Sequence, residues 1–283
     1  MQPGQPSRTA LGAAGLRAAH QVLDGAAIFE DPLALRILGA DADALVREVQ
    51  AEADPYRQRL RWFIAIRSRV AEDALAAALE RGTRQLVVLG AGLDTTAYRS
   101  PPSQDLRIFE VDHPATQAWK RLRLAEANIA LPAALTFVPV DFERETLAEG
   151  LAAAGFDPAQ QTFFTWLGVV PYLTKEAISS TLSQIAAHPG GAEVVFDYGE
   201  PRETIDPALR RQYEERAARV AAAGEPFLSY FVPDELHEAL LALGFERIDD
   251  LDTPAMLKRL LGGAASPRRS PGHVLFAATS AKA

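Results

Sequence analysis

The stretch that decides the fold reads LVVLGAGLDTTAYR at residues 86–99, and IFEVDH follows at residues 108–113. The first apolar run stops at a Gly-Ala-Gly turn (90–92), and the second strand-like run ends in two acids, Glu110 and Asp112. In a doubly wound α/β sheet, such a glycine turn lets the backbone approach a ligand, and the acid after the second strand holds ribose hydroxyls. The two motifs together therefore predict a nucleoside pocket.

The residues after the turn indicate which kind of nucleoside fits. A dinucleotide site needs a third glycine, so that the next helix packs closely and points its N-terminus at a pyrophosphate. Here Thr95 stands at that position, three residues after Gly92, and Asp94 lies in the same turn. A carboxylate there repels a pyrophosphate but not a cationic ligand such as S-adenosylmethionine. The pattern favours an adenosine ligand that carries positive charge.

Length and composition are typical of one domain with its own core. The chain has 283 residues, of which 48% are hydrophobic, so we expect a single domain over 1–283. No apolar run approaches the length of a membrane span, and residues 1–20 lack the apolar segment of a signal peptide. The absence of cysteine excludes disulfides and thiolate sites, and it fits a cytoplasmic protein.

Charge patterning narrows the range of partners. The net charge is −8 and lysine occurs at only four positions, so nothing resembles the basic stripe of a nucleic-acid-binding protein. The five histidines are scattered, without the spacing of metal ligands, and we expect no metal site. We therefore expect a small-molecule partner rather than nucleic acid or membrane, while the oligomeric state is left open.

The first part of the chain is predicted to be mainly helical over residues 8–80. Ser7 or Thr9 is placed to cap the first helix, and Asp31, followed by proline, resembles the start of another. A long amphipathic helix is predicted over Tyr56–Leu79. Because these helices precede the first strand, we expect them to cover its carboxyl end.

From residue 85 onward, strand-like and helix-like segments alternate, which predicts a mostly parallel sheet with helices on both faces. The strands are predicted over Gln85–Leu89, Leu106–Val111, Leu135–Val140, Gln161–Leu167 and Glu193–Tyr198, with helices near 114–130, 143–154 and 174–187. Ligands of such sheets bind outside the carboxyl ends of the strands.

The alternation breaks after Tyr198. A polar, helical insertion is predicted over 200–232, followed by a helix over 233–243. Two more strands, Phe245–Leu251 and His273–Thr279, are expected to close the sheet, with a loop over 262–272 between them. The predicted segments are a helical part over 1–80, a ligand-binding core over 81–199, the insertion over 200–232 and a closing part over 233–283.

Nine stretches form one ordered set of motifs. They read SRTA at 7–10, RAAH at 17–20, FEDPLA at 29–34, IRSR at 66–69, VVLGAGLDTTAYR at 87–99, FEVDHPATQAWK at 109–120, FVPVDFERE at 137–145, FFTWLGVVPYLT at 163–174 and VFDYGEP at 195–201. The set resembles the bacterial branch of the leucine carboxyl methyltransferase family, which uses S-adenosylmethionine. The resemblance implies a class I methyltransferase (Rossmann-like) fold with a mostly parallel seven-stranded sheet and an N-terminal helical lid.

The resemblance also implies cofactor-binding positions around the first strand. Arg67 is similar to the arginine that binds the cofactor's carboxylate in this family. The turn Gly90-Ala91-Gly92 is expected to lie under the amino-acid part of the cofactor.

Three further acids and one aromatic residue match the nucleoside end of the family's site. Asp112 looks like the ribose-binding acid, with Glu110 beside it. Asp141 and Phe142 are similar to the pair that flanks the adenine. Helix capping is the alternative role for each of these acids, because each ends a strand.

The segment after the fourth predicted strand departs from the eukaryotic pattern. Leu167 stands where the eukaryotic members have a glutamate that contacts the cofactor, so the backbone of Gly168 or a water is expected to serve instead. This difference argues against transferring the eukaryotic substrate, a protein C-terminal leucine, to this chain.

Two residues are candidates for catalysis. Tyr172 follows the fourth predicted strand, close to where the transferred methyl group is expected, and His113 adjoins the cofactor acids. A carboxylate acceptor is already ionised near neutral pH and needs no general base, whereas a phenol or alcohol needs one. The sequence shows no clear catalytic dyad, which favours a carboxylate.

The sequence thus predicts an S-adenosylmethionine-dependent O-methyltransferase that forms a methyl ester on a small organic acid, in secondary metabolism. Aromatic and apolar residues at 227–231 (Phe227, Leu228, Tyr230 and Phe231) are expected to enclose the acceptor together with the lid. The alternatives are methylation of a phenol or other hydroxyl, an NAD-dependent oxidoreductase, which Asp94 and the missing third glycine disfavour, and a non-catalytic module that binds an adenosine ligand.

Overall fold

The computed structural model describes residues 7–51, 55–99, 105–141, 145–262 and 271–281. Within these ranges the chain forms one seven-stranded sheet in the order β3-β2-β1-β4-β5-β7-β6. The strands are β1 (Gln85–Leu89), β2 (Arg107–Asp112), β3 (Leu135–Pro139), β4 (Thr162–Trp166), β5 (Ala192–Gly199), β6 (Arg247–Asp252) and β7 (Gly272–Ala278). The first five strands are parallel, and β7 runs antiparallel to β5 and β6. The predicted α/β fold with a mostly parallel sheet is confirmed.

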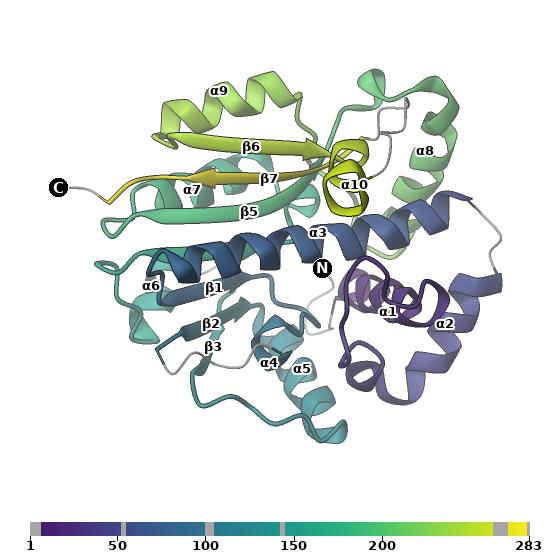
Figure 1. Cartoon of the computed structure of the whole chain (residues 1–283), viewed down its shortest axis with the longest axis horizontal. Helices are drawn as coiled ribbons and strands as arrows, with labels where there is room; N and C mark the ends of the chain where they lie inside the picture. The colour runs from purple at the N-terminus through teal and green to yellow at the C-terminus, as the bar shows by residue number, and fades with distance from the viewer. Residues whose placement is uncertain (1–6, 52–54, 100–104, 142–144, 263–270, 282–283) are drawn as a thin grey trace.

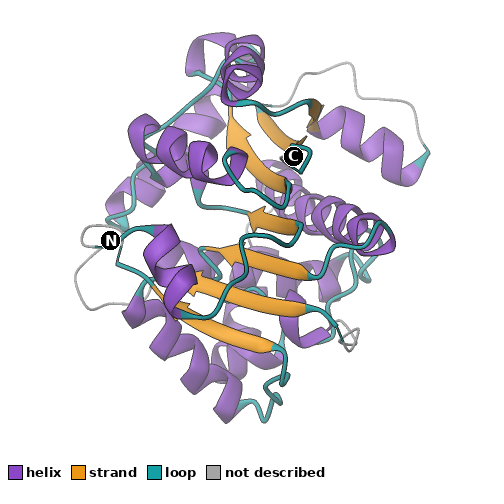
Figure 2. Cartoon of the chain, turned by 90° about the vertical axis from the view of Figure 1, so that its left-hand side faces the viewer, coloured by secondary structure: helices purple, strands orange, loops and turns teal. Residues whose placement is uncertain are grey.

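Helices cover both faces of this sheet (Figure 2). On one face, α6 (Leu147–Ala153), α7 (Lys175–Ala186) and α9 (Pro233–Leu243) pack their leucines and isoleucines against the strands. The other face is covered by α3 (Pro55–Glu80), α4 (Thr96–Arg99) and α10 (Thr253–Leu261). Figure 1 shows α3 running nearly parallel to the strands and extending past their ends toward α1 and α2. Both sides of the central strands are therefore apolar, as buried parallel strands require.

A separate layer of helices lies at one end of the sheet. It consists of α1 (Arg8–Leu23), the 3₁₀ helix η1 (Arg36–Asp41) and α2 (Ala42–Ala51), which share a hydrophobic cluster with α5 (Pro114–Glu126). Helix α8 (Pro207–Ala222) lies at the same end (Figure 1). The helical part over 8–80 and the insertion, far apart in sequence, thus meet beyond the strand ends.

Local sequence signals explain several helix ends. The Ser7 hydroxyl accepts a hydrogen bond from the amide of Ala10 at 3.1 Å and so begins α1. Thr146 and Glu149 form a reciprocal capping box at the start of α6. Gly244 ends α9 in the left-handed region, at φ 101°, which glycine adopts without steric cost. The predicted helix over 233–243 is confirmed to the residue.

Helix α10 lies between β6 and β7, a part of the chain for which the sequence pattern predicts no helix. It begins because the side chain of Asp252 accepts a hydrogen bond from the amide of Ala255 at 2.9 Å, with Pro254 in the first turn. Its apolar side, including Met256, is buried against α3 and the sheet. The sequence therefore carries local signals for this helix, including Gly262 in the left-handed region at its end, and burial against distant elements stabilises so short a helix.

The predicted helix start at Asp31 is wrong. Residues 32–35 form a turn that leads into η1, and the Asp31 carboxylate accepts hydrogen bonds from Arg17 at 2.7 Å and from the Thr95 hydroxyl at 2.6 Å. The acid caps this turn by accepting a hydrogen bond from the amide of Leu33 at 3.0 Å, and it also links α1 to the turn after β1. This link depends on tertiary proximity, because Arg17, Asp31 and Thr95 are far apart in sequence.

A buried polar network stabilises the edge of the sheet at β6 and β7. His273 contacts Asp250 at 3.0 Å and Glu200 at 2.9 Å, and Asp250 also contacts His237 at 2.8 Å. Burial alone lowers the pKa of His273, but the two carboxylates more than offset this effect and raise it. The imidazolium is therefore the form that the folded state favours.

We expect His273→Gln to lower the free energy of unfolding by about 3 kcal/mol at pH 6, because it removes one partner of a buried charged pair. A raised pKa in the folded state means that this contribution is complete below about pH 6.5 and is lost as the pH rises through the folded-state value. Urea unfolding of both proteins between pH 6 and 9 should show the difference shrinking. A difference that stays constant would contradict the assignment.

Candidate functional site

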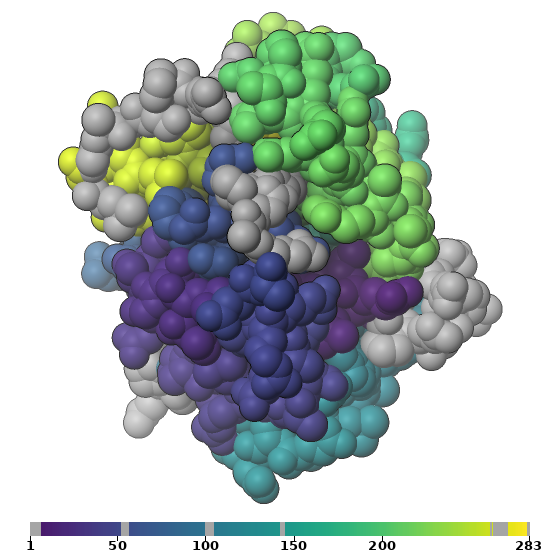
Figure 3. Space-filling view, turned by 90° about the vertical axis from the view of Figure 1, so that its right-hand side faces the viewer, coloured from purple at the N-terminus to yellow at the C-terminus, as the bar shows by residue number. Residues whose placement is uncertain are grey.

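A cavity of about 530 Å³, here called the switch-point cavity, lies at the carboxyl ends of β1, β2 and β4. It is lined by residues 89–94, 112–113 and 166–169, together with residues of α1, α7 and the segment 224–228. The strand order reverses at β1, which pairs with β2 on one side and β4 on the other, and ligands of open α/β sheets bind at such a point. At this end of the molecule, α8 lies next to the N-terminal helices (Figure 3).

The Gly-Ala-Gly turn forms part of this cavity. Gly90 and Gly92 have positive φ of 65° and 41°, and the amides of Gly90 and Ala91 donate to the Val111 carbonyl at 2.8 and 3.1 Å. A Cβ on Gly90 would lie 2.4 Å from a methyl group of Val169. Only glycine therefore fits at this position, and the backbone of the turn faces the cavity.

The two acids of β2 have different surroundings. Asp112 lines the cavity, and its carboxylate accepts hydrogen bonds from the amides of Gly92 at 2.5 Å and His113 at 2.7 Å. Burial raises the pKa of Asp112, while these amides and the cation Lys120 oppose the shift. Asp112 therefore connects the end of β2 to the glycine turn at the cavity surface.

Glu110 lies one full strand repeat deeper, outside the cavity lining, and is only 1% exposed. Its carboxylate pairs with Lys120 Nζ at 2.8 Å and accepts a hydrogen bond from the Tyr98 hydroxyl at 3.0 Å. Burial raises the pKa of Glu110, against the opposing effect of Lys120. The structure thus places Glu110 in the core between β2, α4 and α5, and only Asp112 reaches the predicted ribose position.

Asp94 organises the turn as a charged group. Its carboxylate accepts a hydrogen bond from the amide of Thr96 at 2.8 Å. Burial alone raises the pKa of Asp94, but the cations Lys120, Arg17 and Arg99 more than offset it and lower the pKa. The carboxylate is therefore negative at neutral pH and lines the cavity, where it suits a cationic ligand better than a pyrophosphate.

Arg67 reaches the cavity from the middle of α3. One guanidinium nitrogen, Nη1, donates to Asp197 at 2.8 Å, while Nε is buried without a hydrogen-bond partner among the described residues. Asp197, at the end of β5, also accepts a hydrogen bond from the amide of Gly168 at 2.5 Å. Leu167 and Gly168 both line the cavity, and Gly168 has a φ of 72° and packs directly against Arg67.

Asp197 is a site residue that the sequence interpretation did not select. It is 4% exposed and binds both the arginine and the glycine expected to contact the cofactor. The available signal was its position near the end of an apolar strand, in DYG at 197–199, a placement similar to that of Asp112. Asp197 thus provides a carboxylate near the position at which Leu167 lacks one.

The two candidate catalytic residues both line the cavity. Tyr172, in the 3₁₀ helix η2 (Val170–Tyr172), packs against Phe227 with ring centres 5.2 Å apart, and burial raises its pKa. His113 caps α5, and its Nδ1 accepts a hydrogen bond from the amide of Ala115 at 3.2 Å. A neutral His113 bonded in this way carries its proton on Nε2 and cannot accept another there.

The predicted adenine-flanking pair is only partly described. Asp141 follows β3 and bonds through its backbone to Glu145, but it is not among the residues that line the cavity. Phe142 lies outside the described residues. Glu145, Thr146 and Leu147, the next described residues of this segment, line the cavity, so the connection after β3 borders the predicted adenine end.

A carboxylate from the insertion holds the N-terminus of α1 across the cavity. Glu225 accepts hydrogen bonds from the amides of Arg8 and Thr9, both at 3.0 Å, and from the hydroxyls of Ser7 and Thr9. Ser7, Thr9 and Glu225 all line the cavity. The sequence did not indicate this contact, because its partners are more than 200 residues apart.

Among the described residues, no helix is long and apolar enough to cross a membrane. The same part of the chain contains no group of three or more His, Asp or Glu side chains placed to hold a metal ion.

Comparison with known proteins identifies the family. The family model described as "Leucine carboxyl methyltransferase" matches residues 10–186, more than half of the chain. YktD of Bacillus subtilis (strain 168), named as a candidate S-adenosyl-L-methionine-dependent methyltransferase, is 33% identical over 268 residues, covering 86% of this chain and 88% of YktD. A protein of Frankia alni with a name of the same kind is 34% identical over 192 residues, covering 66% of each chain.

A solved structure, that of a candidate methyltransferase from Thermobifida fusca YX, has the same fold. It superposes with a TM-score of 0.59 at 16% identity and covers 99% of this chain and 97% of its own. The family match identifies the protein as a methyltransferase. It argues against the two alternatives, an NAD-dependent oxidoreductase and a non-catalytic module. The chain belongs to the leucine carboxyl methyltransferase family and is an S-adenosylmethionine-dependent methyltransferase.

Proposed function

We propose that the enzyme methylates an oxygen of a small organic acceptor, and that this oxygen belongs to a carboxylate. The observation that supports the proposal most is the state of the two candidate catalytic side chains, Tyr172 and His113. The pKa of Tyr172 is raised by burial, and His113 uses Nδ1 to cap α5. Neither is poised to remove a proton at neutral pH, and a carboxylate needs no such help.

The switch-point cavity fits S-adenosylmethionine by the chemistry of its lining. The buried Nε of Arg67 lacks a hydrogen-bond partner among the described residues, and the cofactor's carboxylate would satisfy this guanidinium. Asp112 has the position expected for a ribose ligand, at the end of β2 and beside the glycine turn. When bound, the cofactor supplies a methyl group already activated by a positively charged sulfur.

The remaining assignments follow the same arrangement. We assign the amino-acid end of the cofactor to Gly90, Ala91, Gly92, Leu167 and Gly168, whose backbones border the cavity near Arg67. The adenine is assigned to the segment after β3, with Asp141 and Phe142 as its flanking pair. Glu110 contributes indirectly, by holding Lys120 and Tyr98 behind the turn.

The chain's own contribution to the rate would be alignment and exclusion of water. The neutral Tyr172 hydroxyl is placed to donate a hydrogen bond to an acceptor oxygen and so orient it. Residues of α1 and of segment 224–228 line the same cavity, and we assign them the role of a lid. A closed lid removes water from around the acceptor carboxylate, which makes it a better nucleophile.

The function is tested by titrating ligand-free protein with S-adenosylhomocysteine in a calorimeter and assaying labelled-methyl transfer to matched carboxylic acids and phenols. We expect saturable binding and transfer to acids at a rate that does not change between pH 6 and 9, because the acids stay ionised throughout. Transfer to phenols alone, at a rate that rises with pH, would replace the carboxylate proposal with hydroxyl methylation. An absence of cofactor-product binding would contradict the site itself.

Substitutions of the two acids of β2 should distinguish an effect on cofactor binding from an effect on stability. We expect Asp112→Ala to weaken S-adenosylhomocysteine binding by about 100-fold, equivalent to about 2.7 kcal/mol, with the fold retained. Glu110→Gln should lower the free energy of unfolding by about 3 kcal/mol, because it leaves Lys120 buried without its partner, yet change affinity little. Calorimetry and urea unfolding measure both effects. The reverse pattern would assign the ribose to Glu110.

The lid assignment is tested at Glu225. Glu225→Gln replaces a carboxylate that accepts four hydrogen bonds at the start of α1, so we expect S-adenosylhomocysteine to dissociate about tenfold faster in stopped-flow measurements. Glu246→Gln is a matched control, since this exposed acid lies far from the cavity and bonds to Ser280. Equal dissociation rates in all three proteins would show that the contact does not hold the lid.

A further inference from the structure

A second cavity, of about 520 Å³, lies between α3, α8, α10 and the end of β5, and we call it the aromatic chamber. Its lining is mainly apolar and aromatic, with Leu60, Phe63, Tyr213, Phe227, Tyr230 and Leu257 as principal side chains. None of its described lining residues also lines the switch-point cavity, so the chamber is not part of the proposed cofactor site. Its volume is within the range of roughly 300–1,000 Å³ for small-molecule pockets.

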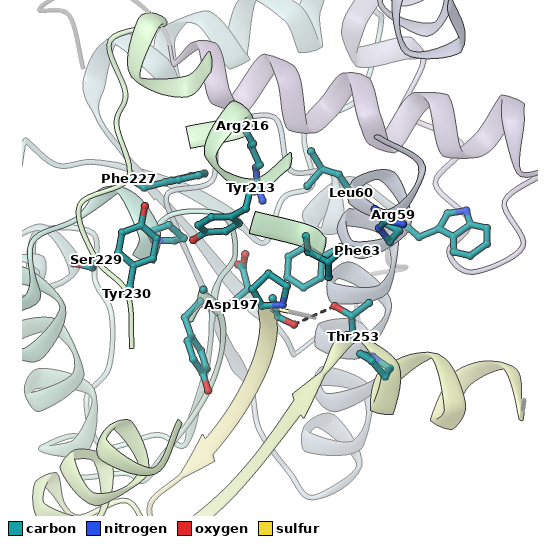
Figure 4. A pocket seen from close by; sticks show the side chains of 18 of the residues that line it. Arg59, Leu60, Phe63, Asp197, Tyr213, Arg216, Phe227, Ser229, Tyr230 and Thr253 are labelled. Atoms are coloured by element: carbon teal, nitrogen blue, oxygen red, sulfur yellow. Dashed lines mark hydrogen bonds between the residues drawn. The ribbon is translucent and has the colours of Figure 1, made fainter. Parts of the chain in front are cut away.

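The aromatic residues of the chamber form a connected cluster. The ring of Phe227 lies 6.5 Å from those of both Tyr213 and Tyr230, and Tyr213 lies 6.1 Å from Tyr230. Figure 4 shows these three rings on one side of the chamber, with Leu60 and Phe63 of α3 opposite them. Rings that already pack on one another offer a rigid apolar surface, which suits a flat or bulky apolar ligand.

A third cavity, of about 340 Å³, adjoins the other two, and we call it the arginine passage. It shares Arg67, Gly168 and Tyr172 with the switch-point cavity, and it shares Leu60, Asp197 and Arg216 with the aromatic chamber. The passage therefore borders both the proposed reaction centre and the chamber. Phe227 of the chamber also contacts Tyr172 directly, with ring centres 5.2 Å apart.

The passage carries an excess of positive charge. Among the described residues, its lining includes five arginines, Arg8, Arg57, Arg67, Arg216 and Arg219, against two acids, Glu48 and Asp197. Asp197 is already neutralised, because its two oxygens accept hydrogen bonds from Arg67 and from the amide of Gly168. An anionic group entering the passage would meet a favourable potential beside Tyr172.

Resting on the function proposed above, we propose that the aromatic chamber binds the apolar body of the methyl acceptor while the arginine passage holds its carboxylate. The preferred acceptor is then an amphiphilic acid: a carboxylate attached to a ring-bearing or similarly bulky apolar body. A short acid would fill the passage alone and lose the burial of apolar surface that the chamber offers. A neutral molecule of the same shape would fill the chamber but lose the interaction with the arginines.

The test uses the complex with S-adenosylhomocysteine and three probes: benzoate, biphenyl-4-carboxylate and biphenyl-4-carboxamide. We expect calorimetry to give a dissociation constant for the biphenyl acid at least about tenfold lower than that of either other probe. Equal affinities of the biphenyl acid and benzoate would overturn the role of the chamber. Equal affinities of the biphenyl acid and its amide would overturn the role of the passage.

Variants of chamber residues then test where the apolar body of the ligand binds. Leu257→Trp on α10 and Leu209→Trp on α8 each fill the chamber from a different helix, and we expect either to weaken biphenyl acid binding about tenfold without affecting benzoate. Leu241→Trp, at an exposed position of α9, is the matched control. Unchanged biphenyl binding in a folded chamber variant would overturn the proposal.

Variants of two arginines of α8 test the role of positive charge in the passage. Arg216→Met should reduce the preference for the acid over the amide, whereas Arg211→Met, on the exposed side of the same helix, should leave it unchanged. Failure of this proposal is distinguishable from failure of the proposed function. If S-adenosylhomocysteine binds and small acids are methylated, but biphenyl acid has no advantage, only the chamber proposal fails; if the cofactor product does not bind, both fail.

Discussion

The buried ion pair between Arg67 of α3 and Asp197 of β5 holds the long helix against the sheet at the point where the three cavities meet. Both side chains are less than 10% exposed, so removal of either one would leave the other charge buried without its counter-charge. The second oxygen of Asp197 accepts a hydrogen bond from Gly168, which fixes the segment after β4 to the same point. The switch-point cavity, the arginine passage and the aromatic chamber are therefore arranged around one neutralised pair.

The position of an acid along its strand decides whether its side chain reaches the cavity or is buried in the core. Asp112, at the last position of β2, reaches the cavity, while Glu110 is covered by α4 and α5 and neutralised by Lys120. Lys120 also lowers the pKa of Asp94, so the buried pair and the charge of the turn are coupled. The turn that lines the switch-point cavity is thus supported by the charges of Glu110 and Lys120, which lie outside the lining.

Two segments that are far apart in the sequence together cover the switch-point cavity. Helix α1 comes from the N-terminal part and segment 224–228 from the insertion, and Glu225 joins them by satisfying the free amides at the start of the helix. The same insertion contributes Phe227 and Tyr230 to the aromatic chamber, whereas Leu228 faces the switch-point cavity. Phe231, expected beside the acceptor, packs instead against the main core. One segment therefore borders the switch-point cavity on one side and the aromatic chamber on the other.

The sequence alone determined the sheet, the glycine turn and the acids at the strand ends, because strand periodicity, left-handed glycine turns and helix caps depend on neighbouring residues. Family motifs added Arg67 and the segment at 167–172, which line the predicted cavity. Tertiary structure alone decided which acid reaches the cavity and that Asp31 links α1 to the turn. It also decided the partners of Asp197 and Glu225. These features depend on contacts between residues far apart in the chain, whose energies appear only once the layers have packed together.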